Sequence, residues 1–184
     1  MKARLYAAAI MMLAAGAAAA ADFTAVRLDR SAVSFVSKQM GVPVDGQFRK
    51  FSAQIAIDPA KPEAGRARID IDLASIDAGA LVDDEVKGRN WFDVRQFPSA
   101  SFVSGSVKSL GGGRFEATGK MTIKGKTQEV RAPFTVKQDN GMVVLDGAFV
   151  LQRLAFGIGS GEWGDPSVVA DDVQIKFRFV VAAK

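Results

Sequence analysis

The sequence predicts an all-β protein whose strands form one closed or nearly closed antiparallel barrel. Three segments, residues 69–74, 130–137 and 173–181, alternate apolar and polar residues over most of their length. Such alternation is typical of strands with one face in an apolar interior and the other in water. Turn sequences such as Asp139-Asn140-Gly141 separate strand patterns and favour antiparallel hairpins. The patterns leave open whether side chains alone or a bound lipid fill the interior.

Strand patterns recur along the chain and predict roughly eight or nine strands, enough to enclose a packed core or one elongated ligand cavity. Phe48 and Phe51 break strict alternation, which predicts a bulge or bend near Arg49 and Lys50. The expected strands cover residues 24–30, 32–39, 44–57, 66–75, 100–107, 115–123, 127–137, 142–151 and 173–182.

The strand pattern lapses between residues 77 and 97. Near residues 80–88 the sequence favours one short helix with acidic residues in its first turns, where the helix dipole favours negative charge. An aromatic-rich connection, residues 89–97, follows. Repeats and Pro/Ser-rich linkers are absent after residue 21, so residues 22–184 are predicted to form one domain.

The N-terminus has the features of an export signal. Lys2 and Arg4 precede an apolar run over residues 5–13, and residues 14–21 are small and end in Ala-x-Ala. We expect residues 1–21 to be a secretory signal peptide cleaved after Ala21. A membrane anchor is the alternative, but the apolar run is short and no basic stop-transfer segment follows it.

Composition excludes several classes of function. Without Lys2 and Arg4 the chain carries 22 basic and 20 acidic side chains, and a net charge of +2 argues against nucleic acid as a partner. The chain has no Cys and no His, and its single Tyr is Tyr6 in the export signal. The usual Ser-His-Asp, Cys-His and His-zinc centres are therefore excluded, and we expect no catalytic residues, no metal and no cofactor.

Five groups of residues occur in a characteristic order. They are Asp29, Ser31, Val33 and Phe35 with Gly41, Val44, Gly46, Phe48 and Phe51; Ile71 to Ser75-Ile76-Asp77; Trp91-Phe92-Asp93-Val94 with Phe97-Pro98-Ser99-Ala100-Ser101-Phe102; Gly119 to Thr127; and Arg153-Leu154-Ala155-Phe156-Gly157-Ile158. Together they resemble the YceI-like family of exported, lipocalin-like proteins, over essentially the whole chain after the signal. The resemblance implies an extended eight-stranded barrel in the bacterial periplasm, with a long isoprenoid or other acyl lipid in its bore.

The chain departs from the family pattern near the helix. Many members carry His near the positions of Gln39 and Val86, and an Arg-Asp pair where this chain has Asp83-Asp84. A headgroup or metal role of those residues is therefore not transferred to this chain. The loop of residues 159–163 resembles only some members.

The predicted lining of the bore consists of apolar residues on the inward strand faces. Each also fits a packed core, the usual place for Phe. Burial of a sixteen-carbon chain there favours binding by about 13 kcal/mol, before the free-energy costs of ordering and association are subtracted. The predicted lining residues are Val33, Phe35, Phe48, Ile71, Phe102, Phe134, Phe149, Phe177 and Phe179.

Six further residues are predicted to line the cavity or its mouth. Trp91, Phe92 and Phe97 form either a gate or a hydrophobic plug, and Trp163 is a second aromatic candidate. Arg153, with apolar neighbours that include Phe156, is expected to be partly buried. Such a guanidinium needs a partner, either an internal carboxylate or the phosphate of a lipid headgroup.

Three functions remain open from the sequence. The first is a non-enzymatic periplasmic protein, monomer or homodimer, that sequesters or ferries a fatty-acyl or isoprenoid lipid such as a quinone, with transient membrane contact. The second is an enzyme on a lipid or glycan substrate with Asp84 or Glu85 as base, although these acids also fit a charged helix N-terminus. The third is a ligand-free interaction module whose partners dock on the Trp91 or Trp163 loops.

Overall fold

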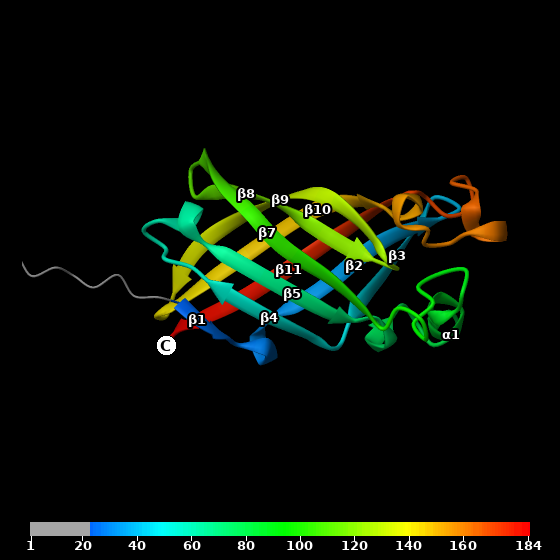
Figure 1. Cartoon of the computed structure of the whole chain (residues 1–184), viewed down its shortest axis with the longest axis horizontal. Coiled ribbons are helices and arrows are strands. Elements are labelled where there is room, and N and C mark those ends of the chain that lie inside the picture. Colours follow the sequence, from blue (N-terminus) through cyan, green and yellow to red (C-terminus); the bar gives the residue numbers. More distant parts are fainter. Residues whose placement is uncertain (1–22) are drawn as a thin grey trace, which may run out of the picture.

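The computed structural model describes residues 23–184, so the predicted signal peptide and its cleavage after Ala21 lie outside the described residues. Within them, eleven strands form one sheet that curls on itself, and each neighbouring pair is antiparallel (Figure 1). The predicted all-β, lipocalin-like architecture with one short helix is confirmed. The prediction of eight strands is wrong: of the nine expected segments, residues 44–57 are divided into two strands, and one short strand, Ile76–Asp77, is added.

The elements follow the predicted order. The strands are β1 (Phe23–Val26), β2 (Ala32–Gln39), β3 (Val42–Phe48), β4 (Phe51–Ala56), β5 (Arg66–Asp72), β6 (Ile76–Asp77), β7 (Ser99–Gly111), β8 (Arg114–Ile123), β9 (Lys126–Asp139), β10 (Met142–Gln152) and β11 (Asp172–Ala183); the helix is α1 (Asp83–Lys87). The hairpin turn between β9 and β10 has positive φ at Asn140 (48°) and Gly141 (73°), as the predicted two-residue turn requires.

The bend predicted near Arg49 and Lys50 closes the sheet. Before the bend β3 pairs with β2, and after it β4 pairs with β5. β4 is one end of the strand order, and β3 lies next to the short strand β6 at the other end. The bend between β3 and β4 therefore joins the two margins of the sheet. The backbone N–H of Arg49 donates to the carbonyl of Ser75 (3.1 Å), and the Ser75 hydroxyl accepts from the N–H of Lys50 (3.0 Å). The curled sheet therefore encloses an interior.

Two clusters of buried apolar side chains occupy the interior. One lies toward the end marked by β1 and the C-terminus in Figure 1, and the other toward the end that carries α1. The first contains Phe23, Val33, Ile55, Ile57, Ile69, Val143, Leu145, Phe179 and Val181. The second contains Leu73, Ala100, Ile123, Leu151, Phe156 and Ile158.

The helix α1 is shorter than the predicted segment of residues 80–88. A turn at Gly79 (φ 109°) precedes it, in which the N–H groups of Val82 and Asp83 donate to the Gly79 carbonyl. Leu81 in this turn is fully exposed, so no apolar contact extends the helix toward residue 80. No helix among residues 23–184 is long and apolar enough to cross a membrane.

Candidate ligand-binding site

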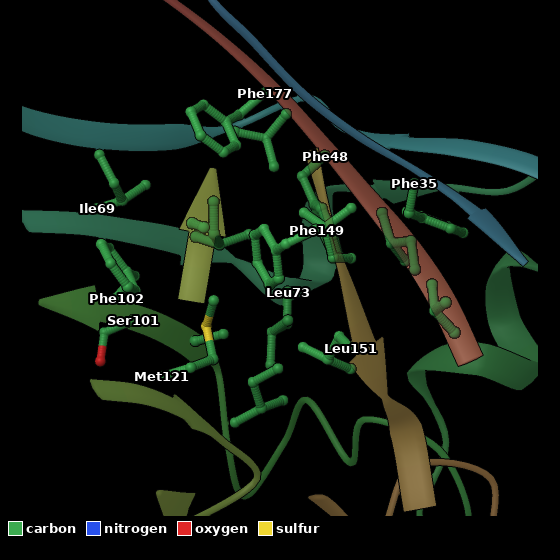
Figure 2. Close-up of a pocket in the computed structure, with 18 of the residues that line it drawn as sticks. Phe35, Phe48, Ile69, Leu73, Ser101, Phe102, Met121, Phe149, Leu151 and Phe177 are labelled. Atoms are coloured by element: carbon green, nitrogen blue, oxygen red, sulfur yellow. The ribbon is translucent and has the colours of Figure 1, made fainter. Parts of the chain in front are cut away.

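A cavity of about 300 Å³ runs through the interior between the two clusters. Its wall is built from inward-facing side chains of the strands from β2 to β11, and Figure 2 shows some of them around one shared space. Among the labelled side chains, Phe102 comes from β7, Met121 from β8, and Phe149 and Leu151 from β10. The lining is almost wholly apolar, which favours an apolar ligand over a polar one.

The inward-facing phenylalanines do not fill the interior. Six of them are half-buried although they point away from bulk solvent, whereas a packed core would leave such rings with little exposed surface. Their remaining exposure is toward the cavity, and the wall therefore presents unburied aromatic surface to whatever enters. These residues are Phe35, Phe48, Phe102, Phe134, Phe149 and Phe177.

Glycines on the inner wall let two of these rings lie flat. Gly46 is the cross-strand partner of Phe35, and Gly147 that of Phe177. A Cβ atom built at either glycine would overlap the phenyl ring. Glycine inside a strand commonly marks such a close approach. Because the rings cover the backbone of the neighbouring strand instead of standing upright, the middle of the bore stays open.

Two segments cover the end of the barrel that carries α1. We name residues 78–98 the first cap segment and residues 153–171 the second (Figure 1). Phe48 connects the bore to the first cap: its ring centroid is 5.7 Å from that of Phe35 and 6.2 Å from that of Phe92. An apolar path therefore leads from the middle of the cavity to the caps.

Direct contacts join the two cap segments. The N–H of Ser160 donates to the Asn90 carbonyl (2.8 Å), and Trp163 Nε1 donates to Glu85 Oε1 (3.0 Å). The Trp163 ring lies against Trp91, with 5.6 Å between the ring centroids. These contacts hold the caps together over the end of the barrel.

Lys124, in the turn between β8 and β9, links both caps to the barrel wall. Its Nζ donates to the carbonyls of Arg89 (2.8 Å) and Gly157 (3.0 Å). Burial lowers the pKa of Lys124, with Lys126 acting in the same direction and Asp93 opposing it. The residue belongs to a turn predicted from sequence, but its role in the caps depends on loops distant in the chain.

The structure corrects both predicted roles of Arg153. Its side chain is only 1% exposed, and no acidic side chain lies within ion-pair distance of it among residues 23–184. All five guanidinium N–H groups donate to backbone carbonyls at 2.6–3.0 Å, so none is left for a phosphate. Burial lowers the pKa of Arg153 and Asp171 raises it, but a guanidinium remains charged. The acceptors are Ile158, Gly159, Trp163, Val169 and Ala170.

Arg153 therefore organises the second cap. Its acceptors come from three parts of that segment, residues 158–159, 163 and 169–170, which fold around the guanidinium. Its guanidinium carbon also lies 5.8 Å from the centre of the Trp91 ring, a cation–π distance. Sequence reasoning missed this role because backbone carbonyls leave no signal in the residue types around an arginine.

Thirteen of the fifteen predicted site residues line the cavity. Phe97 and Phe156 do not: Phe97 lies against Gly125, 3.1 Å from where a Cβ would stand, and Phe156 is buried in the cluster at the capped end. Whether a ligand touches any of them stays a prediction. The thirteen are Val33, Phe35, Phe48, Ile71, Trp91, Phe92, Phe102, Phe134, Phe149, Arg153, Trp163, Phe177 and Phe179.

Several lining residues were not predicted. Four of them lie two or four residues from a predicted phenylalanine on the same strand, and Ile69 and Leu73 lie two residues from Ile71, which places them on the same face. Met121 lies on β8, where no lining residue was predicted. Glu85, predicted as a helix-terminal charge, also borders the cavity. Further members of the lining are Ile69, Leu73, Ala100, Met121, Leu145, Leu151 and Ile175.

The curled antiparallel sheet with an apolar, capped bore defines a lipocalin-like barrel. Residues 25–181 match the model of the YceI-like domain, and the chain belongs to the YceI-like family. A UPF0312 protein of Azotobacter vinelandii is 34% identical over 122 residues, which cover 65% of this chain and 64% of that protein. The chain thus matches just under two thirds of this relative's length.

Solved structures show the same fold. BcnA of Burkholderia cenocepacia is 49% identical with a TM-score of 0.82, over 84% of this chain and 98% of that one. The YceI protein of Campylobacter jejuni is 19% identical (TM-score 0.70, 77% and 85% coverage). A polyisoprenoid binding domain of Saccharophagus degradans, implicated in plant cell wall breakdown, is 14% identical (TM-score 0.66, 89% and 99% coverage).

Proposed function

We propose that this protein binds a long-chain isoprenoid-type or fatty-acyl lipid in the bore of its barrel, without catalysing a reaction. The observation that carries the proposal is the half-buried state of the six inward-facing phenylalanines around the cavity. When an apolar chain covers the apolar surface of an unfilled interior, binding is stabilised by about 25 cal/mol for each Å² removed from water. A lipid chain supplies such cover without any charged or catalytic group.

One structural neighbour supports the choice of ligand class. The S. degradans domain is described as polyisoprenoid binding, and it shares this fold over most of the chain. We extend the proposal to an isoprenoid quinone or prenyl intermediate as cargo, and to sequestration or ferrying in the periplasm. Delivery of such a cargo requires transient contact with a membrane. The predicted export signal at residues 1–21 supports the proposed location.

Native mass spectrometry of protein purified from its own periplasm tests the proposal. We expect a co-purifying lipid that organic extraction releases, and that re-binds to the extracted protein. An extracted protein that takes up neither its own lipid nor any isoprenoid or fatty acid of similar length contradicts the proposal.

A matched pair of variants on β8 locates the binding. Met121 lines the cavity, whereas its neighbour Lys120 is exposed on the outer face. Met121→Trp fills the bore and is expected to reduce lipid uptake at least severalfold, while Lys120→Trp leaves uptake unchanged. Equal uptake by the two variants, both folded by circular dichroism, contradicts binding in the bore.

The two alternative functions have less support. Glu85, one of the proposed bases, already accepts the hydrogen bond of Trp163, and no group of three or more His, Cys, Asp or Glu placed to hold a metal occurs in residues 23–184. The interaction module required a barrel packed throughout with side chains, and the cavity is not compatible with that packing.

A further inference from the structure

Three large apolar side chains stand in water at the capped end of the barrel. Leu81 is fully exposed, and Met40 and Val42 are 75% and 63% exposed. These three are the most exposed large hydrophobic residues in the part of the chain that the structure describes. Single exposed apolar residues are ordinary, whereas a group of them at one place marks an interaction surface. The less exposed members of the same class are Leu28, Val103, Leu110 and Val150.

The three side chains flank the mouth of the cavity on two sides. Met40 and Val42 belong to the β2–β3 hairpin, where the neighbouring Gln39 lines the cavity. Leu81 belongs to the first cap segment and is followed by Val82, which lines the cavity as well. Figure 1 shows this hairpin and α1 at the same end of the barrel. The exposed apolar surface therefore borders the place where the bore ends.

Hydrogen bonds of the main chain hold both projections in place. The N–H of Met40 donates to the Val168 carbonyl (2.8 Å), which ties the hairpin to the second cap segment. The turn that carries Leu81 is held by the Asp83 side chain, whose Oδ1 accepts from the N–H of Ala78 (2.8 Å). The apolar side chains thus project from turns whose backbones are bonded within the protein.

The charges at this end balance. Acidic and basic residues are equally numerous in the hairpin tip (residues 38–44), the two cap segments and the turn at residues 124–126. Lys38 lies on the hairpin tip, and Asp84 lies close to Leu81 along the chain. Attraction to an anionic leaflet requires a cluster of Lys and Arg, which these segments lack. A surface with both signs of charge instead complements zwitterionic headgroups, which carry a phosphate and an amine.

We propose that the capped end docks on a zwitterionic phospholipid bilayer, with Met40, Val42 and Leu81 inserted among the headgroups and the mouth of the cavity facing the membrane. A bilayer accepts apolar side chains that project from separate turns, whereas a protein partner needs a complementary pocket for each. This inference rests on the proposed lipid-binding function and adds to it the surface through which the cargo is exchanged.

Site-specific fluorescence tests the docking. Because the chain has no Cys, Met40→Cys, Val42→Cys and Leu81→Cys each give one site for an environment-sensitive fluorophore. Leu110→Cys is the control, since Leu110 is an exposed leucine in the β7–β8 hairpin at the opposite end (Figure 1). With phosphatidylcholine vesicles we expect brighter, blue-shifted emission at the three projecting positions and an unchanged spectrum at residue 110.

Three results of this measurement overturn the proposal. The first is an unchanged spectrum at all four positions, and the second is an equal response at Leu110→Cys, which indicates unspecific adsorption. The third is a change that grows with protein concentration in the absence of vesicles, which identifies a second copy of the chain as the occupant. Binding that requires added phosphatidylglycerol and disappears in salt overturns the assignment to a zwitterionic surface.

Cargo transfer connects the docking to the proposed function. Leu81→Glu is expected to weaken vesicle binding by about tenfold, because it removes one apolar anchor and adds a charge. It should also slow the transfer of a fluorescent fatty acid from vesicles severalfold, while uptake of the same fatty acid dispersed from ethanol is unchanged. Leu110→Glu, the control, should alter neither binding nor transfer.

The two sources of fatty acid separate the two proposals. Equal transfer rates from vesicles for Leu81→Glu and Leu110→Glu overturn the role of the capped end in exchange. Failure of the wild-type protein to take up the dispersed fatty acid overturns the proposed lipid-binding function, whereas the labelled variants still decide the docking.

Discussion

Arg153 is a buried cation whose hydrogen-bond partners are all uncharged. Its guanidinium gathers five backbone carbonyls that otherwise face the interior of the second cap without donors. Removing one partner of a buried polar network leaves the other groups unsatisfied, which is more costly than the bond itself is worth. The residue is therefore structural in this chain.

Arg153→Met is expected to lower the free energy of unfolding by about 2–4 kcal/mol, because several buried carbonyls lose their donors. Urea denaturation measures the change. Arg131→Met, at an exposed position on β9, is the control and is expected to change stability by less than about 0.5 kcal/mol. Equal stability of the two variants would contradict the assigned role.

Asp77 joins β6 to the bend that closes the sheet. Its Oδ2 accepts from Gln47 Nε2 (3.1 Å) and Arg49 Nη2 (2.7 Å). These two hydrogen bonds, with the charge of Arg49, hold the pKa of Asp77 below its ordinary value despite some desolvation. A carboxyl whose pKa is lower in the folded state stabilises the fold above its unfolded-state pKa, and this contribution is lost as the pH falls through the folded-state pKa.

Asp77→Asn is expected to lower stability at pH 7 and to flatten the loss of stability below about pH 4, because the substituted residue no longer titrates. Urea midpoints at neutral and acidic pH measure both effects. Asp45→Asn, at an exposed position on the same strand as Gln47, serves as the control. An acid dependence identical to that of the wild type in Asp77→Asn would refute this account.

At the scale of elements, the width of the bore depends on pairs of neighbouring strands. Each glycine on the wall of β3 or β10 accommodates a phenyl ring from the strand beside it. The surroundings of the two glycines differ. The three atoms nearest to the position of a Cβ at Gly46 all belong to the Phe35 ring, whereas at Gly147 the backbone carbonyl of Pro133 stands 2.6 Å from that position.

Gly46→Ala is therefore expected to turn the Phe35 ring into the bore and to shorten the longest fatty acid that binds, with little loss of stability. Gly147→Ala meets backbone as well, and is expected to cost about 1–3 kcal/mol of stability. Displacement of a fluorescent fatty acid by a series of chain lengths, with thermal melting, measures both. Gly164→Ala, where a Cβ meets open space, is the control. An unchanged chain-length limit in Gly46→Ala would show that Phe35 does not set the width.

At the scale of the whole molecule, the barrel is closed by side chains at one end and covered by two loops at the other. The cluster around Phe23 and Val181 fills the first end, whereas hydrogen bonds and two tryptophans join the caps at the second. Loops open at lower cost than packed strands. We therefore expect lipid to enter and leave through the capped end.

The export prediction also concerns the whole molecule. If residues 1–21 are a signal peptide, the mature protein begins at Asp22 and is recovered from the periplasm. Intact-mass measurement of periplasmic and membrane fractions tests this expectation. Recovery of the full-length chain in the membrane fraction would favour the membrane anchor instead.

Much of the fold was predictable because strand patterns are local. The alternation around Ile175 and Phe177 identified the inward face of β11, and the misfit between Phe48 and Phe51 located the bend at Arg49. The two-residue turn at Asn140 and Gly141 was equally predictable, since its positive φ angles favour Asn and Gly. Thirteen lining residues followed from the faces and motifs alone.

The amino-acid sequence by itself determined which residues share a face, where hairpins turn and to which family the chain belongs, because these properties depend on neighbours along the chain. Only the tertiary structure decided that the phenylalanines leave a cavity, that Arg153 binds carbonyls, that Phe97 lies outside the lining and that Leu81 stays in water at the capped end. These features depend on how distant strands and loops meet, and residue types alone do not specify such contacts.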